Sequence, residues 1–278
     1  MNANYEIAVA AVLAGLVAIF VTVAIEKFGG IIGGIIGTVP TTILPAAIFM
    51  WVADPREPVF ESAMSMVPAG MLLNAVFLWL WRIIPPIIPD WSFGKRLFSI
   101  TVINLSVWFT GAALLVALFT MFNPLIIGCV ALITGIVFGL WATMEYHPAP
   151  TGENEVGILM LAVRGIAAAC AIGIAVWFSQ HGSPLLAGIA SVFPAIFLTS
   201  MVALWISQGE DVPSGAVGPM MLGGMSVSLY ALLATRLFPE QGIIVGSALA
   251  WIASLLLISI PATFWLRLRH NYAVARAH

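Results

Sequence analysis

Apolar residues run through this chain in long stretches, separated by short gaps that hold most of the charged residues and clusters of glycine and proline. Each stretch has the roughly 20 residues that a helix needs to cross the hydrocarbon core of a bilayer, and alternating barrel strands do not fit. With charges, Gly/Pro clusters and terminal aromatics as boundaries, the pattern predicts nine membrane-spanning helices, at about 5–25, 30–53, 62–84, 97–120, 124–144, 156–178, 184–206, 214–236 and 243–266.

The chain also repeats itself at a constant, ungapped spacing of 154 residues. The repeated residues are Gly34, Pro40, Trp51, Met66, Gly70, Met71, Arg82 and Pro85, which recur as Gly188, Pro194, Trp205, Met220, Gly224, Met225, Arg236 and Pro239. Because an odd number of predicted spans separates equivalent points, the two copies insert in opposite directions. We therefore expect an all-α integral membrane protein with a 4+1+4 inverted repeat: a four-helix repeat over 1–120, a connecting helix and loop over 121–155, and an inverted repeat over 156–278.

Composition agrees with this class, since 62% of the residues are hydrophobic and only 8% are charged. Soluble domains have about 45–50% apolar and about 25% charged residues. The net charge of −2 gives no basic footprint for nucleic acid. Cys129 and Cys170 lie inside apolar runs, where we expect buried, inert thiols rather than a disulfide or a metal pair.

The positive charges give the predicted topology a direction. One side has only Arg56 and Arg236, and the other collects Lys27, Arg82, Lys95, Arg96, Arg267, Arg269 and Arg276. By the positive-inside rule the second side is cytoplasmic. We expect a multi-pass protein of the cell inner membrane, with its N-terminus outside and its C-terminus in the cytoplasm.

Each repeat carries a proline in its second span, Pro40 in the first and Pro194 in the second. Proline removes a backbone donor and displaces the carbonyl four residues earlier, which here belongs to Ile36 or Ala190. Broken helices at corresponding positions of inverted halves point to a central binding site, whereas a simple kink is the alternative. Among the side chains available to meet a freed carbonyl are Thr38 and Thr41.

Small residues recur every fourth position just before these prolines. They are Gly29, Gly33 and Gly37 in the first repeat and Ser183, Ala187 and Ser191 in the second. Such stripes let helix backbones approach closely, so they predict close helix packing or, as the functional alternative, a moving seam between the repeats.

Few polar residues lie inside the predicted spans. Asn74 and its equivalent Ser228 are candidates for orienting a substrate, as is Asn104, and a structural role is the alternative for each. Arg164 lies two turns into the sixth span, and its equivalent is Ala10. An intramembrane charge is a functional hypothesis by default, so Arg164 is a candidate for an anionic substrate or headgroup, or else it snorkels to the interface.

The sequence lacks the residues that several other functions require. No Asp or Glu lies at the centre of a predicted span, which counts against proton-coupled multidrug export. The paired methionines allow a soft-metal path, but no Cys/His cluster accompanies them. An enzyme would have to use the loop residues Glu145, His147, Glu153 and Glu155, where no catalytic motif is present. We expect no enzymatic activity, no cofactor and no bound metal.

The segments Gly30-Ile-Ile-Gly-Gly-Ile-Ile-Gly-Thr-Val-Pro40 and Pro184-Leu-Leu-Ala-Gly-Ile-Ala-Ser-Val-Phe-Pro194 resemble the entry of small GlpM-like bacterial membrane proteins. This resemblance implies a four-span unit in each half. The organisation is also similar to a fused pair of small multidrug-resistance transporters, although their carboxylate in the first span is missing here.

Together these patterns predict a transporter that moves a small neutral, amphiphilic or anionic solute by alternating access. A non-transporting subunit of a membrane complex, or a lipid-handling protein, is the alternative. We expect membrane lipid and a small-molecule substrate as partners, and leave a homo-oligomer open. The candidate substrate-binding residues are Thr38, Pro40, Thr41, Asn74, Asn104, Arg164, Pro194 and Ser228.

Overall fold

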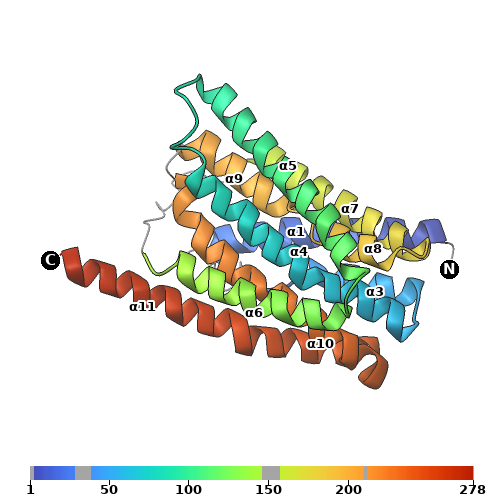
Figure 1. The fold of residues 1–278 in the computed structure, drawn as a ribbon. Coiled ribbons are helices and arrows are strands. Elements are labelled where there is room, and N and C mark those ends of the chain that lie inside the picture. The colour runs from blue at the N-terminus through green and yellow to red at the C-terminus, as the bar shows by residue number, and fades with distance from the viewer. Residues whose placement is uncertain (1–2, 29–38, 146–156, 210–211, 278) are drawn as a thin grey trace.

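The computed structural model describes residues 3–28, 39–145, 157–209 and 212–277, and all regular structure in these ranges is helical. The helices lie along a common direction as a bundle, with the start of α1 and the end of α11 at opposite ends (Figure 1). Their bounds are α1 (Ala3–Phe28), α3 (Ile43–Ala53), α4 (Glu57–Ile83), α5 (Phe93–Phe119), α6 (Pro124–Ala142), α7 (Ile158–Gln180), α8 (Pro184–Ser191), α9 (Ala195–Gln208), α10 (Val212–Ser254), the π-helical η1 (Leu255–Ser259) and α11 (Ile260–Ala277).

Within the described ranges, six helical stretches are long and apolar enough to cross a membrane. One of them, residues 215–275, is 61 residues long, about three times the length that a bilayer core requires. It turns back at Gly242, whose φ of 76° suits glycine. As a result the hydroxyls of Tyr230 and Ser247 lie 2.8 Å apart.

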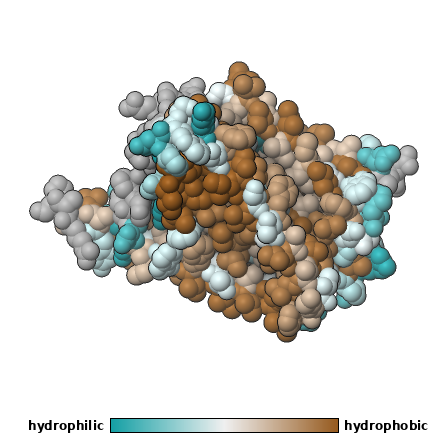
Figure 2. All heavy atoms as spheres, turned by 45° about the horizontal axis from the view of Figure 1, so that its top comes forward, coloured by the Kyte–Doolittle hydropathy of each residue, from teal (hydrophilic) through white to brown (hydrophobic). Residues whose placement is uncertain are grey.

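Apolar side chains cover much of the outside of the bundle. Large hydrophobic residues are exposed along α5, α6 and α11, including Phe109, Ile133 and Phe264. Figure 2 shows apolar residues across the middle of one face and hydrophilic residues toward its two ends. In the part of the chain that the structure describes, these features are those of a multi-pass integral membrane protein.

Helices from the two halves of the chain pair in antiparallel fashion. α1 packs along α7, where Glu6 accepts a hydrogen bond from Gln180 at 3.1 Å. Further along, a Cβ atom on Gly15 would lie 3.3 Å from the Cβ of Ala169, so two residues that are 154 apart in the sequence face each other. α4 packs along α10 in the same way, with Glu61 near Arg236 at 3.9 Å.

α4 is the central helix, since it is largely buried and packs against α5, α6, α8 and α10. Small residues bring its neighbours close. A Cβ atom on Gly188 of α8 would lie 2.2 Å from the carbonyl oxygen of Ala63, and one on Gly128 of α6 would lie 2.7 Å from that of Ser65. On α8 the close contact with α4 is made by Gly188, the neighbour of the predicted stripe residue Ala187, and on α6 it is made by Gly128, which the 154-residue repeat does not single out.

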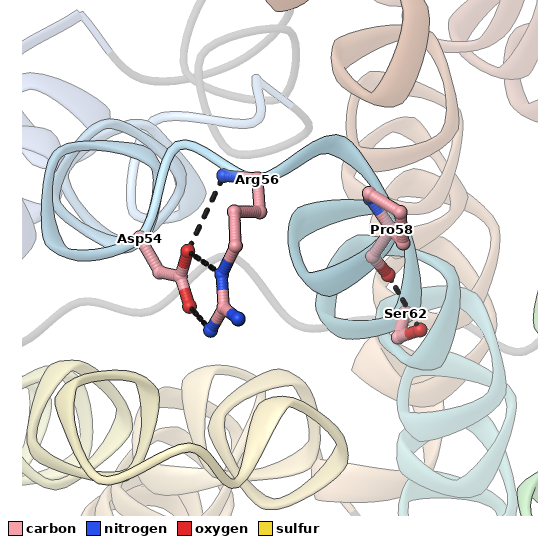
Figure 3. A network of polar contacts seen from close by, with 4 residues as sticks. All are labelled: Asp54, Arg56, Pro58 and Ser62. Atoms are coloured by element: carbon pink, nitrogen blue, oxygen red, sulfur yellow. Dashed lines mark hydrogen bonds and ion pairs between the residues drawn. The ribbon is translucent and has the colours of Figure 1, made fainter.

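Two arginines form hydrogen bonds at the two ends of the bundle. In the α3–α4 turn, Arg56 donates to the carboxylate of Asp54, and the Ser62 hydroxyl donates to the Pro58 carbonyl (Figure 3). The hydrogen bond from Arg56 holds the pKa of Asp54 below its ordinary value of 3.8. At the other end, Arg82 donates to the carbonyl of Ala142 at 2.8 Å.

Cys129 and Cys170 are unpaired but exposed on the surfaces of α6 and α7, so the prediction of buried thiols is wrong. An apolar run does not by itself say which helix face meets lipid. The stripe Gly29, Gly33 and Gly37 and the loop residues His147, Glu153 and Glu155 lie outside the described residues.

Candidate functional site

The helical stretch Pro184–Ile206 is broken at Pro194. α8 ends at Ser191, α9 begins at Ala195, and Val192 to Pro194 lie between them. The carbonyl of Ala190, which we expected proline to set free, accepts a hydrogen bond from the Phe193 amide at 3.1 Å. The carbonyl that reaches a distant side chain is that of Val192.

Asn74 of α4 ties this break to the rest of the bundle. Its Nδ2 donates to the Val192 carbonyl at 2.8 Å, and its Oδ1 accepts from the indole Nε1 of Trp108 at 2.7 Å. Asn74 and Trp108 are both buried. A buried polar group without a hydrogen-bond partner destabilises the folded state. These two hydrogen bonds of Asn74 therefore favour one conformation of the break.

The first repeat has the equivalent start of a helix. α3 begins at Ile43, and Thr41 and Thr42 separate it from the buried Pro40. The Thr41 amide donates to the Val39 carbonyl at 2.8 Å. Neither α3 nor α9 has a side-chain hydrogen bond at its N-cap. The first turns of both helices therefore keep backbone N–H groups that no capping side chain satisfies.

A cavity of about 350 Å³ lies between these two helix starts. Its wall contains residues from α1, α4, α7 and α10 as well as both breaks. Many wall residues are pairs 154 positions apart: Ala18 with Ile172, Val39 with Phe193, Thr41 with Ala195, Thr42 with Ile196, and Ile43 with Phe197. Both halves of the chain thus contribute the same segments to one central space.

Arg164 is the charged residue of this wall among the residues described. It is 7% exposed, and its guanidinium donates to the hydroxyl of Ser200 at 3.0 Å and, more weakly, to that of Thr199 at 3.4 Å. The Thr199 hydroxyl in turn donates to the Ala195 carbonyl at 2.9 Å. Arg164 thus lies inside the bundle, hydrogen-bonded to α9.

The candidate residues divide by their distance from this cavity. Thr41, Asn74 and Arg164 line it, and Pro40 and Pro194 are each flanked by residues that line it. Asn104 and Ser228 are buried but do not belong to the wall. The Asn104 amide donates to the Ile100 carbonyl of its own helix, and the Ser228 hydroxyl has no hydrogen-bond partner among the described residues. Thr38 lies outside the described residues.

Sequence analysis does not single out Thr199, Ser200 or Trp108. A serine hydroxyl on an apolar helix more often donates to the backbone of its own helix. The sequence therefore gives no reason to select Ser200, and its role becomes visible only because Arg164 faces it in the structure. Among the described residues, no group of three or more His, Cys, Asp or Glu is placed to hold a metal ion.

No family model, no curated protein and no solved structure matches this chain. The resemblance of each half to GlpM-like proteins therefore stays a prediction.

Proposed function

We propose that this protein is a transporter, in which a small solute binds in the central cavity and reaches either side of the membrane in turn. The observation that carries the proposal is the composition of the cavity wall. Segments 154 residues apart in the sequence, at the starts of α3 and α9, face the same space. Inverted repeats with broken helices at a shared site are the architecture of alternating-access transporters.

The proposed topology has nine spans in a 4+1+4 inverted repeat. The antiparallel packing of α1 on α7 and of α4 on α10 supports it. Arg82 and Arg96 lie where α4 ends and α5 begins, and Trp265 of α11 donates to Thr143 at the same end of the bundle. With this end in the cytoplasm, the N-terminus lies outside and the C-terminus inside.

Movement would consist of rocking one half against the other about the helix breaks. The close backbone contacts at Gly15 and Gly188 supply surfaces that can slide, because small residues leave few interlocking side chains. Asn74 joins the break in α8–α9 to α4, so it couples that break to the central helix.

Cysteine accessibility tests the proposal. Thr41 and Ala195 are equivalent wall residues, and each is replaced by cysteine in a background without Cys129 and Cys170. Labelling with a membrane-impermeant maleimide is expected from both sides, with one side blocked when a ligand or a crosslink traps one state. Arg56→Cys and Lys95→Cys serve as topology controls, labelled only from outside and only from inside.

Labelling of the two cavity positions from one side only, under every condition, would contradict alternating access. Purified protein in liposomes that moves no solute and co-purifies with a stable partner would instead favour a subunit of a membrane complex. If the controls are labelled from the sides opposite to those expected, the topology is reversed although the mechanism still stands.

A further inference from the structure

We infer that the central cavity binds a neutral, mostly apolar molecule, which is held by the burial of its apolar surface and by at most one hydrogen-bonding group. This inference names the substrate class of the site and rests on the proposed function only for the step of transport. It starts from two properties of the wall. Its buried polar side chains are bonded within the protein, and most of its other residues are apolar.

The buried amide in the wall has its hydrogen bonds already. Asn74 donates to the Val192 carbonyl at 2.8 Å and accepts from the indole of Trp108 at 2.7 Å. At the end of α8, the Ser191 hydroxyl donates to the Gly188 carbonyl at 2.7 Å. A ligand that relied on these groups would have to replace bonds that the folded protein makes by itself, so they add little to its affinity.

The charged group in the wall is engaged as well. The guanidinium of Arg164 donates to the hydroxyls of Ser200 and Thr199, and Arg164 has a further interaction besides these. An ion that enters the cavity loses its hydration, and this loss is costly unless a new partner replaces the water. A wall whose polar groups are already bonded therefore favours a ligand without charge.

Two half-buried threonines can meet a single polar group of the ligand. Thr41 and Thr42 line the cavity just before α3, and the side chain of Thr42 makes no capping hydrogen bond to that helix. A hydroxyl both donates and accepts. Either threonine can therefore bond an alcohol or a carbonyl oxygen on an otherwise apolar molecule.

The apolar part of the wall contains flexible thioethers. Met71 and Met220 both line the cavity. A Cβ atom on Gly224 would lie 2.8 Å from the terminal methyl of Met71 and 3.7 Å from the ring of Phe197, so these residues meet at the cavity. Methionine repacks easily around differently shaped partners. We therefore expect several related apolar molecules to bind.

The volume of the cavity limits the size of the ligand. A cavity of about 150 Å³ holds one benzene molecule. In proportion, the 350 Å³ between the two helix starts hold about a dozen non-hydrogen atoms. Phenylhexanol is close to this limit, phenylpropanol is below it, and phenyldodecanol exceeds it.

Isothermal titration of the purified full-length protein in a neutral detergent tests the absence of charge. The probes are phenylhexanol, phenylhexanoate and phenylhexylammonium, which share one apolar body. We expect phenylhexanol to bind at least about tenfold more tightly than either ion, because neither ion gains a partner that repays its lost hydration. Equal or tighter binding of either ion would overturn the inference.

Chain length tests the size of the ligand in the same assay. We expect affinity to rise from phenylpropanol to phenylhexanol and to rise no further with phenyldodecanol. A continued rise to phenyldodecanol would indicate that a lipid acyl chain occupies the site, and would overturn the assignment to a small molecule.

Two variants on α7 assign the binding to the cavity. Ala171 is buried and lines it, whereas Ala162 is exposed and does not. Ala171→Leu adds three carbons, which fill roughly a quarter of the volume. It should weaken phenylhexanol at least about tenfold and spare the smaller phenylpropanol, while Ala162→Leu should change neither. Partition of the probes into detergent is the same for both variants, so equal affinities in the two would overturn the inference.

Gly224→Ala decides if Ala171→Leu does not fold. Its added methyl meets the flexible end of Met71, which can move. Phenylhexanol must then weaken relative to phenylpropanol, and an unchanged ratio of the two affinities would place the ligand elsewhere.

The cysteine experiment separates this inference from the proposed function. If the Thr41 and Ala195 cysteines show alternating access but no neutral probe binds, the transporter proposal stands and this inference fails. If phenylhexanol binds as expected without alternating access, the site is correct and transport is not.

Discussion

Replacing Asn74 with alanine removes a side chain that joins α4 both to the break between α8 and α9 and to α5. The substitution leaves the Val192 carbonyl and the Trp108 indole N–H without their partner, and both lie in the buried interior. The loss of free energy should therefore exceed that of an ordinary polar-to-alanine change.

The magnitude follows from the number of bonds. An interhelical hydrogen bond in a membrane is worth about 0.6–2 kcal/mol, and Asn74 makes two. We expect Asn74→Ala to lower the free energy of unfolding by about 1–4 kcal/mol. Trp108→Phe removes one of the two bonds, so the double variant should cost less than the sum of the single variants.

Ser228→Ala is the matched control, because Ser228 is the equivalent of Asn74 in the second repeat. Its hydroxyl is fully buried and has no hydrogen-bond partner in the part of the chain that the structure describes. Removing an unpaired hydroxyl is expected to leave stability unchanged or to raise it slightly. Titration with SDS in mixed micelles, followed by far-UV circular dichroism, measures both variants against the wild type. Equal stabilities of Asn74→Ala and Ser228→Ala would refute the reasoning.

Four other substitutions test separate parts of the structure. Gly188→Ala should lower the free energy of unfolding by about 1–3 kcal/mol through overpacking, because its Cβ would lie 2.2 Å from a backbone oxygen of α4. Gly173→Ala, whose Cβ would have its nearest contact at 3.4 Å, should be tolerated. Thermal unfolding compares the two variants. Asp54→Asn should lower the Tm near neutral pH only. Since the pKa of Asp54 is lowered on folding, its contribution exists above the ordinary value of 3.8 and is lost as the pH falls through the lowered value. Arg236→Gln should change the unfolding free energy by less than about 1 kcal/mol, because its 3.9 Å contact with Glu61 is mostly exposed.

Much of the helical pattern could be predicted from the sequence. The length of an apolar stretch is dictated by the thickness of the bilayer, so α4, α5, α6 and α7 begin and end close to the predicted boundaries. The break at Pro194 also lies where the missing backbone donor predicts it. Both predictions depend on local features, the length of an apolar stretch and the position of a proline, and these can be read from a single sequence.

The pairing of side chains across helices could not be predicted in this way. The contact between Asn74 and Val192 spans 118 positions, and that between Arg164 and Ser200 spans 36. Whether such residues meet depends on how each helix is rotated about its axis. Asn104 and Ser228 illustrate the limit, since both are buried polar residues of the predicted kind and both lie away from the cavity.

The cavity combines a symmetric frame with an asymmetric charge. If two inverted repeats were identical, rocking either way would give states of equal free energy, and neither side of the membrane would be favoured. Arg164 breaks this equivalence because the equivalent position is the buried Ala10 of α1. Its hydroxyl partners belong to α9 alone, so the second repeat carries the charged part of the site as one unit. Rocking would then move Arg164 with one half, against a wall from the other half that carries no described charge.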